Sequence, residues 1–195
     1  MRHNRNVPGV LNLAIHHLAE DSPESAQAFF DMYTHATQAV QGAGAPTLWK
    51  RVTGEELLVI TLFPDLDTLN ECENQFVMTR AFERFVRQTE QVEDIDRFSI
   101  IHHQGSTPDE VPIGGYCSTN SHIAGPGFVQ DELTESRYIL DSLWQIEGFL
   151  GAYVGRSLMA PSRLDSLAFW GDVAAAEKAI PIRVETNLRM YRRLF

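Results

Sequence analysis

The chain has 195 residues, of which 44% are hydrophobic and 22% charged, as is ordinary for a soluble protein of one or two small domains. Its formal net charge of −10 predicts no binding to nucleic acid or to anionic membranes, because both would repel it. No apolar run reaches transmembrane length, and the basic N-terminal stretch is a poor signal peptide. Cys72 and Cys117 are expected to stay reduced, which favours a cytoplasmic location.

The first half of the chain predicts the order strand, helix, strand, strand, helix, strand. An apolar strand at 10–18 is followed by a helix that begins at Ser22, a capping residue, and Pro23, which suits the first helical position. Apolar residues at three- and four-residue spacing continue this helix to Val40. Further elements are strands at 47–53, 57–63 and 94–102, and a helix from Asp65 or Asp67 to about residue 86.

The second half repeats this order after a linker rich in proline and glycine, residues 105–115. It predicts strands at 116–124, 151–158, 164–170 and 184–194, and helices at 129–144 and 173–179. The second of these helices is shorter than its counterpart. Residues 9–104 and 116–195 are therefore predicted to be two tandem ferredoxin-like units of βαββαβ order, in the α+β class.

The two halves also match residue by residue. When the second half is overlaid on the first, Arg51 aligns with Arg156 and Phe63 aligns with Trp170, and the two shifts along the chain are nearly equal. A period of one domain length indicates a duplication rather than a solenoid repeat. A four-stranded sheet with helices on one face must bury its other face, so we expect the two units to close on each other as an intramolecular α/β barrel. The barrel interior is then the natural pocket.

Two short stretches resemble a known family. GFLGAYVGRSL at 148–158, followed by LAFWGD at 167–172, resembles the antibiotic-biosynthesis-monooxygenase type of dimeric α/β barrel. The resemblance implies that fold, together with one of several activities: oxygenation of polyketide phenols without a cofactor, quinol oxygenation, haem degradation, or none. Haem-degrading relatives place an axial histidine on the second helix of the unit, whereas MTRAFERFV at 78–86 has none. We therefore expect no cofactor.

Strand alternation nominates the site residues. Asn12 and His16 share one face of the first strand, and a shift of 106 positions, from 16 to 122, brings Asn120 and His122 to the matching face. This face is assigned to the barrel interior. The opposite face, with its leucines, is assigned to the helices. Other side chains expected at the substrate, from the second and third strands of each unit, are Trp49, Arg51, Phe63, Arg156 and Trp170.

The chemistry implied by the family needs an aromatic pocket, a base and a donor for the developing oxyanion. His16 or His122 would be the base, Asn12 or Asn120 would orient the substrate carbonyl, and Trp170 would form an aromatic wall. A structural interpretation stays open for every one of them: a hydrogen-bonded core histidine, a core tryptophan, or an arginine paired with surface carboxylates.

Two functions therefore remain at this point. The first is a cofactor-independent monooxygenase that acts on a small aromatic substrate, a quinol, phenol or anthrone-like compound, in the barrel interior. The alternative is a non-catalytic barrel that binds a small apolar ligand or a protein partner. A homodimer is compatible with both. No Gly-rich nucleotide loop, P-loop or zinc-spaced cluster of cysteine and histidine is present in the sequence.

Overall fold

A computed structural model describes residues 9–18, 22–78, 89–179 and 188–195. The first half contains β1 (Val10–Leu18), α1 (Pro23–Gln38), β2 (Thr47–Arg51), β3 (Leu57–Phe63), α2 (Leu66–Met78) and β4 (Thr89–Gly105). The second half contains η1 (Pro108–Glu110), β5 (Tyr116–Ile123), α4 (Val129–Leu143), β6 (Phe149–Ser157), β7 (Arg163–Trp170), α5 (Val173–Ala179) and β8 (Arg189–Arg193). The predicted order of elements is confirmed, although β4 begins before the predicted residue 94. The predicted end of the second helix near residue 86 and the predicted start of the last strand at residue 184 lie outside the described residues.

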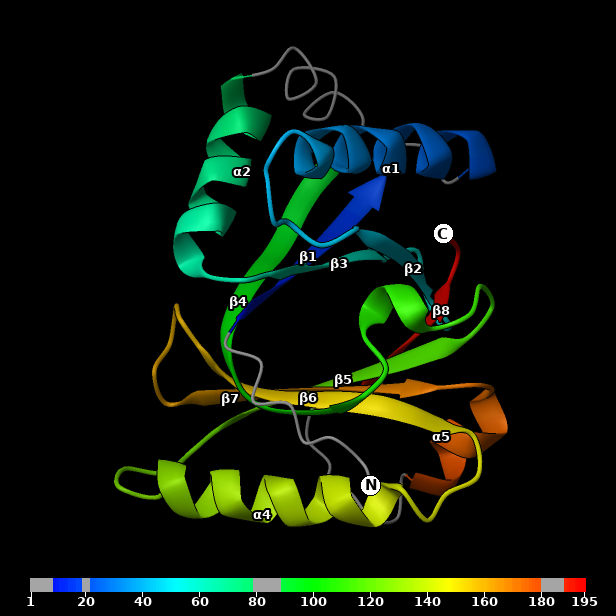
Figure 1. Cartoon of the computed structure of the whole chain (residues 1–195). Coiled ribbons are helices and arrows are strands. Elements are labelled where there is room, and N and C mark those ends of the chain that lie inside the picture. Colours follow the sequence, from blue (N-terminus) through cyan, green and yellow to red (C-terminus); the bar gives the residue numbers. More distant parts are fainter. Residues whose placement is uncertain (1–8, 19–21, 79–88, 180–187) are drawn as a thin grey trace.

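The strands close into one barrel in the order β1-β3-β2-β8-β5-β7-β6-β4. Each half contributes four consecutive strands, and the halves meet at the β2–β8 and β4–β6 pairings. Helices α1 and α2 lie on one side of the barrel, and α4 and α5 lie on the opposite side (Figure 1). The predicted α+β class, with two ferredoxin-like units forming an intramolecular α/β barrel, is confirmed. Whether the units arose by duplication stays a prediction.

The strand register relates the two halves by a half-turn about the barrel axis. His16 of β1 lies opposite Leu57 of β3, and His122 of β5 lies opposite Leu164 of β7. Moving four places around the eight-stranded ring carries β1 to β5, β3 to β7, β2 to β6 and β4 to β8. The offset found in the sequence therefore pairs positions that are equivalent in space and lie on opposite sides of the barrel.

Helix α1 begins where the sequence predicts. The Ser22 side chain accepts a hydrogen bond from the Ser25 backbone N–H at 3.1 Å, and Pro23 occupies the first turn, where its missing N–H leaves no partner unsatisfied. The helix buries Ala26 and Phe29 against the outer face of the sheet, in a cluster with Ala14. Each helix of this barrel thus covers an outer face that is itself apolar.

The assignment of strand faces from the sequence is wrong in one respect. Leu11 and Leu13 point into the barrel, where they pack with Trp49 and Phe169, whereas Ala14 points outward to α1. Both faces of each strand are buried in a closed barrel, so hydrophobicity does not distinguish them. The larger leucines fill the interior, and the small Ala14 leaves room for the helix.

The segment between the two halves closes one end of the barrel. Val111 is buried among the interior side chains, and the guanidinium of Arg193 donates hydrogen bonds to the carbonyl oxygens of Pro108 and Asp109, at 3.2 and 3.0 Å, and to that of Val111. Because this segment covers one mouth, the other mouth is where a ligand can enter.

Both cysteines are free thiols, as predicted. Cys72 lies on α2 and packs against the outer face of the sheet, whereas Cys117 is fully buried in the barrel interior, so the two lie in different clusters. Burial raises the pKa of each thiol, which keeps both protonated at neutral pH. Among the described residues, every helix is too short or too polar to cross a membrane.

Candidate functional site

A cavity of about 580 Å³ lies at the open mouth of the barrel. Its volume falls within the range of small-molecule sites, about 300–1,000 Å³. Apolar side chains from β1 and β3 form one wall, which Asp96 of β4 borders, and mainly polar side chains from β5, β7 and β8 form the other. The residues that line the cavity are Leu13, Ile15, Leu58, Asp96, Thr119, Ser121, His122, Ile123, Arg163 and Arg189. The cavity is therefore amphipathic.

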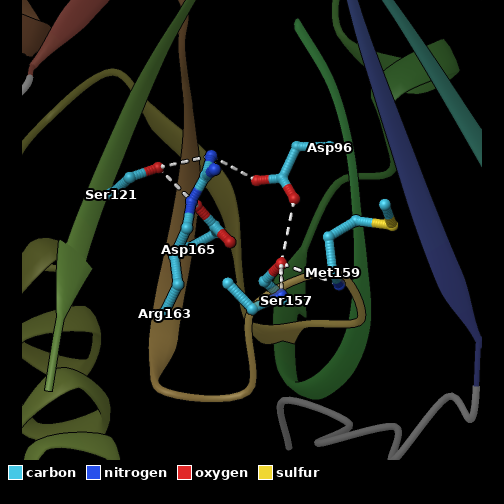
Figure 2. Close-up of polar contacts among 7 residues, drawn as sticks. Asp96, Ser121, Ser157, Met159, Arg163 and Asp165 are labelled. Atoms are coloured by element: carbon cyan, nitrogen blue, oxygen red, sulfur yellow. Dashed lines mark hydrogen bonds and ion pairs between the residues drawn. The ribbon is translucent and has the colours of Figure 1, made fainter.

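Arg163 organises the polar wall. Its guanidinium lies 2.5 Å from Asp96 Oδ2 and donates to Asp165 Oδ1 at 3.1 Å and to Ser121 Oγ at 3.3 Å (Figure 2). The Ser121 hydroxyl donates in turn to Asp165. The Arg163–Asp96 contact joins β7 of the second half to β4 of the first, so the polar wall forms only when the barrel closes.

Asp96 is the carboxyl group best placed for proton transfer. It lines the cavity although its residue is only 4% exposed, and the Ser157 hydroxyl donates to its Oδ1 at 3.2 Å. Burial, followed by the charge of Asp165, raises the pKa of Asp96 to about 6, although Arg163 opposes the shift. A carboxyl group that titrates near neutral pH can both accept and return a proton.

Ser157 ties this carboxyl group to the rim of the barrel. The backbone N–H groups of Met159 and Ala160 each donate to Ser157 Oγ at 3.1 Å, so the serine hydroxyl holds the β6–β7 hairpin while it donates to Asp96 (Figure 2). The position of Asp96 is thus set from two sides, by the arginine and by the serine.

A second charged network lies at the same mouth. Glu56 is buried and forms an ion pair with Arg51, and its Oε2 accepts a hydrogen bond from the Tyr191 hydroxyl at 3.2 Å. Arg189 Nη1 lies 3.8 Å from the same oxygen. Arg189 also lines the cavity, so Glu56 helps to hold a cation at the cavity wall.

The two networks occupy equivalent positions with their charges exchanged. In the strand register, Leu13 lies opposite Asp96, and its equivalent Thr119 lies opposite Arg189. Asp96 and Arg189 therefore occupy equivalent positions in the two halves. Leu57 and Leu164 are equivalent in the β1–β3 and β5–β7 registers. The residues that immediately precede them, Glu56 and Arg163, are therefore equivalent too. The Asp96–Arg163 and Glu56–Arg189 contacts each join a carboxylate of the first half to an arginine of the second.

Comparison with known proteins supports the fold. No family profile matches the chain, and no curated protein matches it significantly. Among solved structures, a candidate monooxygenase from Fusobacterium nucleatum is 12% identical, with a TM-score of 0.75 over 98% of this chain and 94% of that one. An anthrone oxidase-like protein is 15% identical, with a TM-score of 0.69 over 100% and 95%.

A third structure carries the superfamily name. It is a ferredoxin-fold protein from Listeria monocytogenes related to antibiotic biosynthesis monooxygenases, 8% identical, with a TM-score of 0.54 over 98% of this chain and 99% of that one. The chain has the fold of the antibiotic-biosynthesis-monooxygenase-like dimeric α/β barrels. Because the barrel strands of this fold come from one chain here, each side chain can be placed relative to the barrel interior without a partner subunit.

The prediction that His16 projects into the barrel cavity is wrong. His16 is fully buried on the outer face of β1, where its Nε2 lies 2.8 Å from the Tyr33 hydroxyl of α1 and its ring packs edge-on against Phe29. Burial, followed by the neighbouring His17, lowers the pKa of His16 to about 3, so the imidazole is neutral. This is the hydrogen-bonded core histidine of the structural interpretation.

His122 lies at the rim of the cavity rather than inside it. Its Nε2 lies 2.8 Å from Glu132 Oε2 of α4, which directs the imidazole toward the helix. Asn120 is on the same outward face of β5, and Asn12 is on the outward face of β1, between residues that pack under the first-half helices. The predicted placement of both asparagines in the cavity is therefore wrong as well.

The aromatic predictions divide between the two faces. Trp170 and Phe63 lie on outward faces, and Trp170 Nε1 donates to Ser118 Oγ at 3.1 Å beneath the second-half helices, so neither can form a cavity wall. Trp49 does point inward, but it stacks on Phe169 with ring centroids 5.8 Å apart in the packed part of the barrel. All three are core residues.

The two predicted arginines also differ. Arg51 is at the mouth, where it forms an ion pair with Glu56, but it does not line the cavity itself. Arg156 is exposed on the outward face of β6, where its Nε donates to the Pro161 carbonyl at 2.5 Å, so its predicted placement in the barrel interior is wrong. The equivalence of these two positions in the sequence does not give them equivalent surroundings.

Sequence reasoning missed charged residues inside the strands, among them Asp96, Asp165, Arg163 and Arg189. Aspartate is disfavoured in a strand interior, much as asparagine is, and both aspartates fall within strands that the sequence predicts. A search for acidic residues within the predicted strands would therefore have found both aspartates. Among the described residues, no group of three histidine, cysteine or acidic side chains lies close enough together to hold a metal ion.

Proposed function

We propose that the protein is a cofactor-independent monooxygenase that acts on a small aromatic compound, a quinol, phenol or anthrone-like molecule, in the cavity at the barrel mouth. The observation that carries this proposal is Asp96, a buried carboxyl group on the cavity wall whose pKa is raised to about 6. The base is thus a carboxylate of β4 and not a histidine. The anthrone oxidase-like neighbour supports the choice of substrate class.

The cavity suits such a substrate on both sides. Leu13, Ile15 and Leu58 offer an apolar surface for the flat ring system. On the other side, the guanidinium of Arg189 can stabilise the negative charge that forms on an aromatic oxygen when the substrate loses a proton. A base and a cation at equivalent positions of the two halves therefore face the same bound molecule.

For an anthrone-like substrate the steps balance as follows. Asp96 takes one proton from the ring CH₂ group, and the resulting anion gives one electron to O₂. The substrate radical and superoxide combine to form a C–O bond, and the proton held by Asp96 returns to the peroxide. Loss of the second C–H proton and cleavage of the O–O bond leave a carbonyl group and release one water. The substrate supplies all the electrons.

The test is oxygen consumption by purified, chelator-treated protein with an anthrone or hydroquinone substrate, and with no added flavin, haem or metal. One O₂ should be consumed for each carbonyl formed on an anthrone, and Asp96→Asn should lower turnover by roughly 10²-fold or more. Asp31→Asn, which changes an exposed carboxylate on α1, is the matched control and should keep full turnover. Equal turnover in both variants would remove Asp96 from the mechanism.

The second candidate is a non-catalytic barrel that binds a small apolar ligand or a protein partner. It is favoured by the two ion-pair networks, in which the carboxylates Asp96 and Glu56 already contact arginines. Aromatic packing such as Trp49 on Phe169 also fills the barrel below the cavity. Tight binding of an anthrone without oxygen consumption would support this candidate. The cytoplasmic location, the absence of nucleic-acid and membrane partners, and a homodimer stay predictions.

A further inference from the structure

The two long walls of the cavity are equivalent positions of the two halves. Leu13 and Ile15 of β1 correspond to Thr119 and Ser121 of β5, because β1–β3 and β5–β7 share one register. Strands β1 and β5 lie four places apart in the ring of eight, on opposite sides of the barrel. A ligand in the cavity therefore has one wall on each side. The two walls have equivalent backbone positions and differ in the side chains that these positions carry.

The substitutions make one wall polar and leave the other apolar. On the β5 side, the Ser121 hydroxyl donates to Asp165 and accepts from Arg163 at 3.3 Å, and Thr119 adds a second hydroxyl. On the β1 side, the side chains of Leu13 and Ile15 have no hydrogen-bonding group, and Asp96, which lies opposite Leu13 on β4, is already bound by Arg163 and by the Ser157 hydroxyl. Behind the apolar wall, Leu58 occupies the position equivalent to Asp165, so the difference extends to the neighbouring strand.

We propose that the cavity selects an aromatic ligand whose polar groups all lie along one edge, and that it binds this ligand in a single orientation. The polar edge faces Thr119, Ser121 and Arg163, and the hydrocarbon edge faces Leu13 and Ile15. The inference rests on the proposed function only in taking the ligand to be aromatic. It adds the arrangement of polar groups on the ligand, which the fold alone does not supply.

The selectivity follows from the cost of burying a hydroxyl group without a partner. A ligand with hydroxyl groups on opposite edges must press one of them against the β1 wall, where it loses water and gains no hydrogen bond. A ligand of the same composition with both hydroxyl groups on one edge avoids this loss. We expect a difference of about tenfold in dissociation constant between two such isomers.

Two dihydroxynaphthalenes provide the matched probes. The 2,7-isomer carries both hydroxyl groups toward one long edge, and the 2,6-isomer carries them toward opposite edges. Calorimetric titration of the whole protein under argon measures binding without turnover. The 2,7-isomer should bind about tenfold more tightly. Equal affinities, tighter binding of the 2,6-isomer, or no binding of either isomer at millimolar concentration would overturn the inference.

A variant that makes the two walls alike tests the cause. Ile15→Ser places on β1 the residue found at the equivalent position of β5, and it should strengthen binding of the 2,6-isomer until the preference falls to about twofold or less. Ile15→Thr keeps a β-branched side chain and serves if the serine variant does not fold. Ile113→Ser, at an exposed position on the segment that closes the far end, is the control and should keep the full preference.

The outcomes separate this inference from the proposed function. A preference for the 2,7-isomer that Ile15→Ser abolishes, in a protein that consumes no oxygen, would support the inference and refute the oxygenase. Oxygen consumption with an anthrone, together with no preference between the isomers, would do the reverse. A preference that survives both Ile15→Ser and Ile15→Thr in folded protein would show that the β1 wall is not its cause.

Discussion

Asp96→Asn should stabilise the protein at alkaline pH and not at acid pH. The pKa of Asp96 is raised from 3.8 to about 6, so the folded protein binds a proton more tightly than the unfolded chain does between these values. The free energy of unfolding therefore falls as pH rises from 3.8 to about 6. The fall is about 3 kcal/mol, because each pKa unit corresponds to about 1.36 kcal/mol. Asparagine resembles the protonated carboxyl group in shape and carries no charge, so it avoids this loss.

The measurement is the free energy of unfolding in urea, for the native protein and the variant, at pH 4 and pH 8. The free energy of unfolding of Asp96→Asn, relative to that of the native protein, should increase by about 1–3 kcal/mol from pH 4 to pH 8. All other titrating groups are common to both proteins and largely cancel. Asp31→Asn controls for the loss of one negative charge at an exposed position.

A difference that stays constant between pH 4 and pH 8 would refute the reasoning, because it would mean that the folded and unfolded proteins hold the Asp96 proton equally well. Combined with loss of turnover in the same variant, the expected result would show that Asp96 is retained for chemistry at a cost in stability.

Two further changes test the packing on either side of the sheet. His16→Ala should cost about 2–4 kcal/mol of stability, because it removes a fully buried ring that is hydrogen-bonded to Tyr33, and it should leave turnover unchanged. The control is His35→Ala, in the last turn of α1, which should have almost no effect on stability. A large loss of turnover with intact folding would return His16 to the mechanism. Gly155→Ala would place a Cβ atom 2.1 Å from Phe98 Cδ2 in the barrel interior, and should destabilise by about 1–3 kcal/mol or more. Gly171→Ala, whose Cβ atom would meet nothing closer than 3.7 Å, should cost much less, and equal unfolding midpoints for the two glycine variants would contradict this packing.

Local signals in the sequence were sufficient for the element order. Ser22 and Pro23 begin α1 through interactions within one turn, and the structure places the helix start where they predict it. The offset between the halves was also readable, because it depends only on matching residue types along the chain. The register confirms it at His16 and His122, which both lie at the mouth end of equivalent strands.

The candidate site could be predicted only in part, because alternation gives two faces without saying which one turns inward. His16 and Leu13 alternate as the sequence requires, yet closure of the barrel sends the leucine inward and the histidine to the helix. In an open sheet the polar face would meet solvent, and the assignment from polarity would hold. In a closed barrel covered by helices neither face meets solvent, so the choice depends on which side chains fill the interior.

The sequence by itself determined the strands and helices, their repetition, and the presence of aspartates within strands, because each depends on interactions between near neighbours in the chain. Only the tertiary structure decided that Asp96 meets Arg163, since their contact crosses from one half to the other. The raised pKa of Asp96 follows from burial and from the charge of Asp165 in the other half, and neither exists until the barrel closes. The fold could thus be read from local patterns, whereas the chemistry of the cavity depends on which distant residues closure brings together.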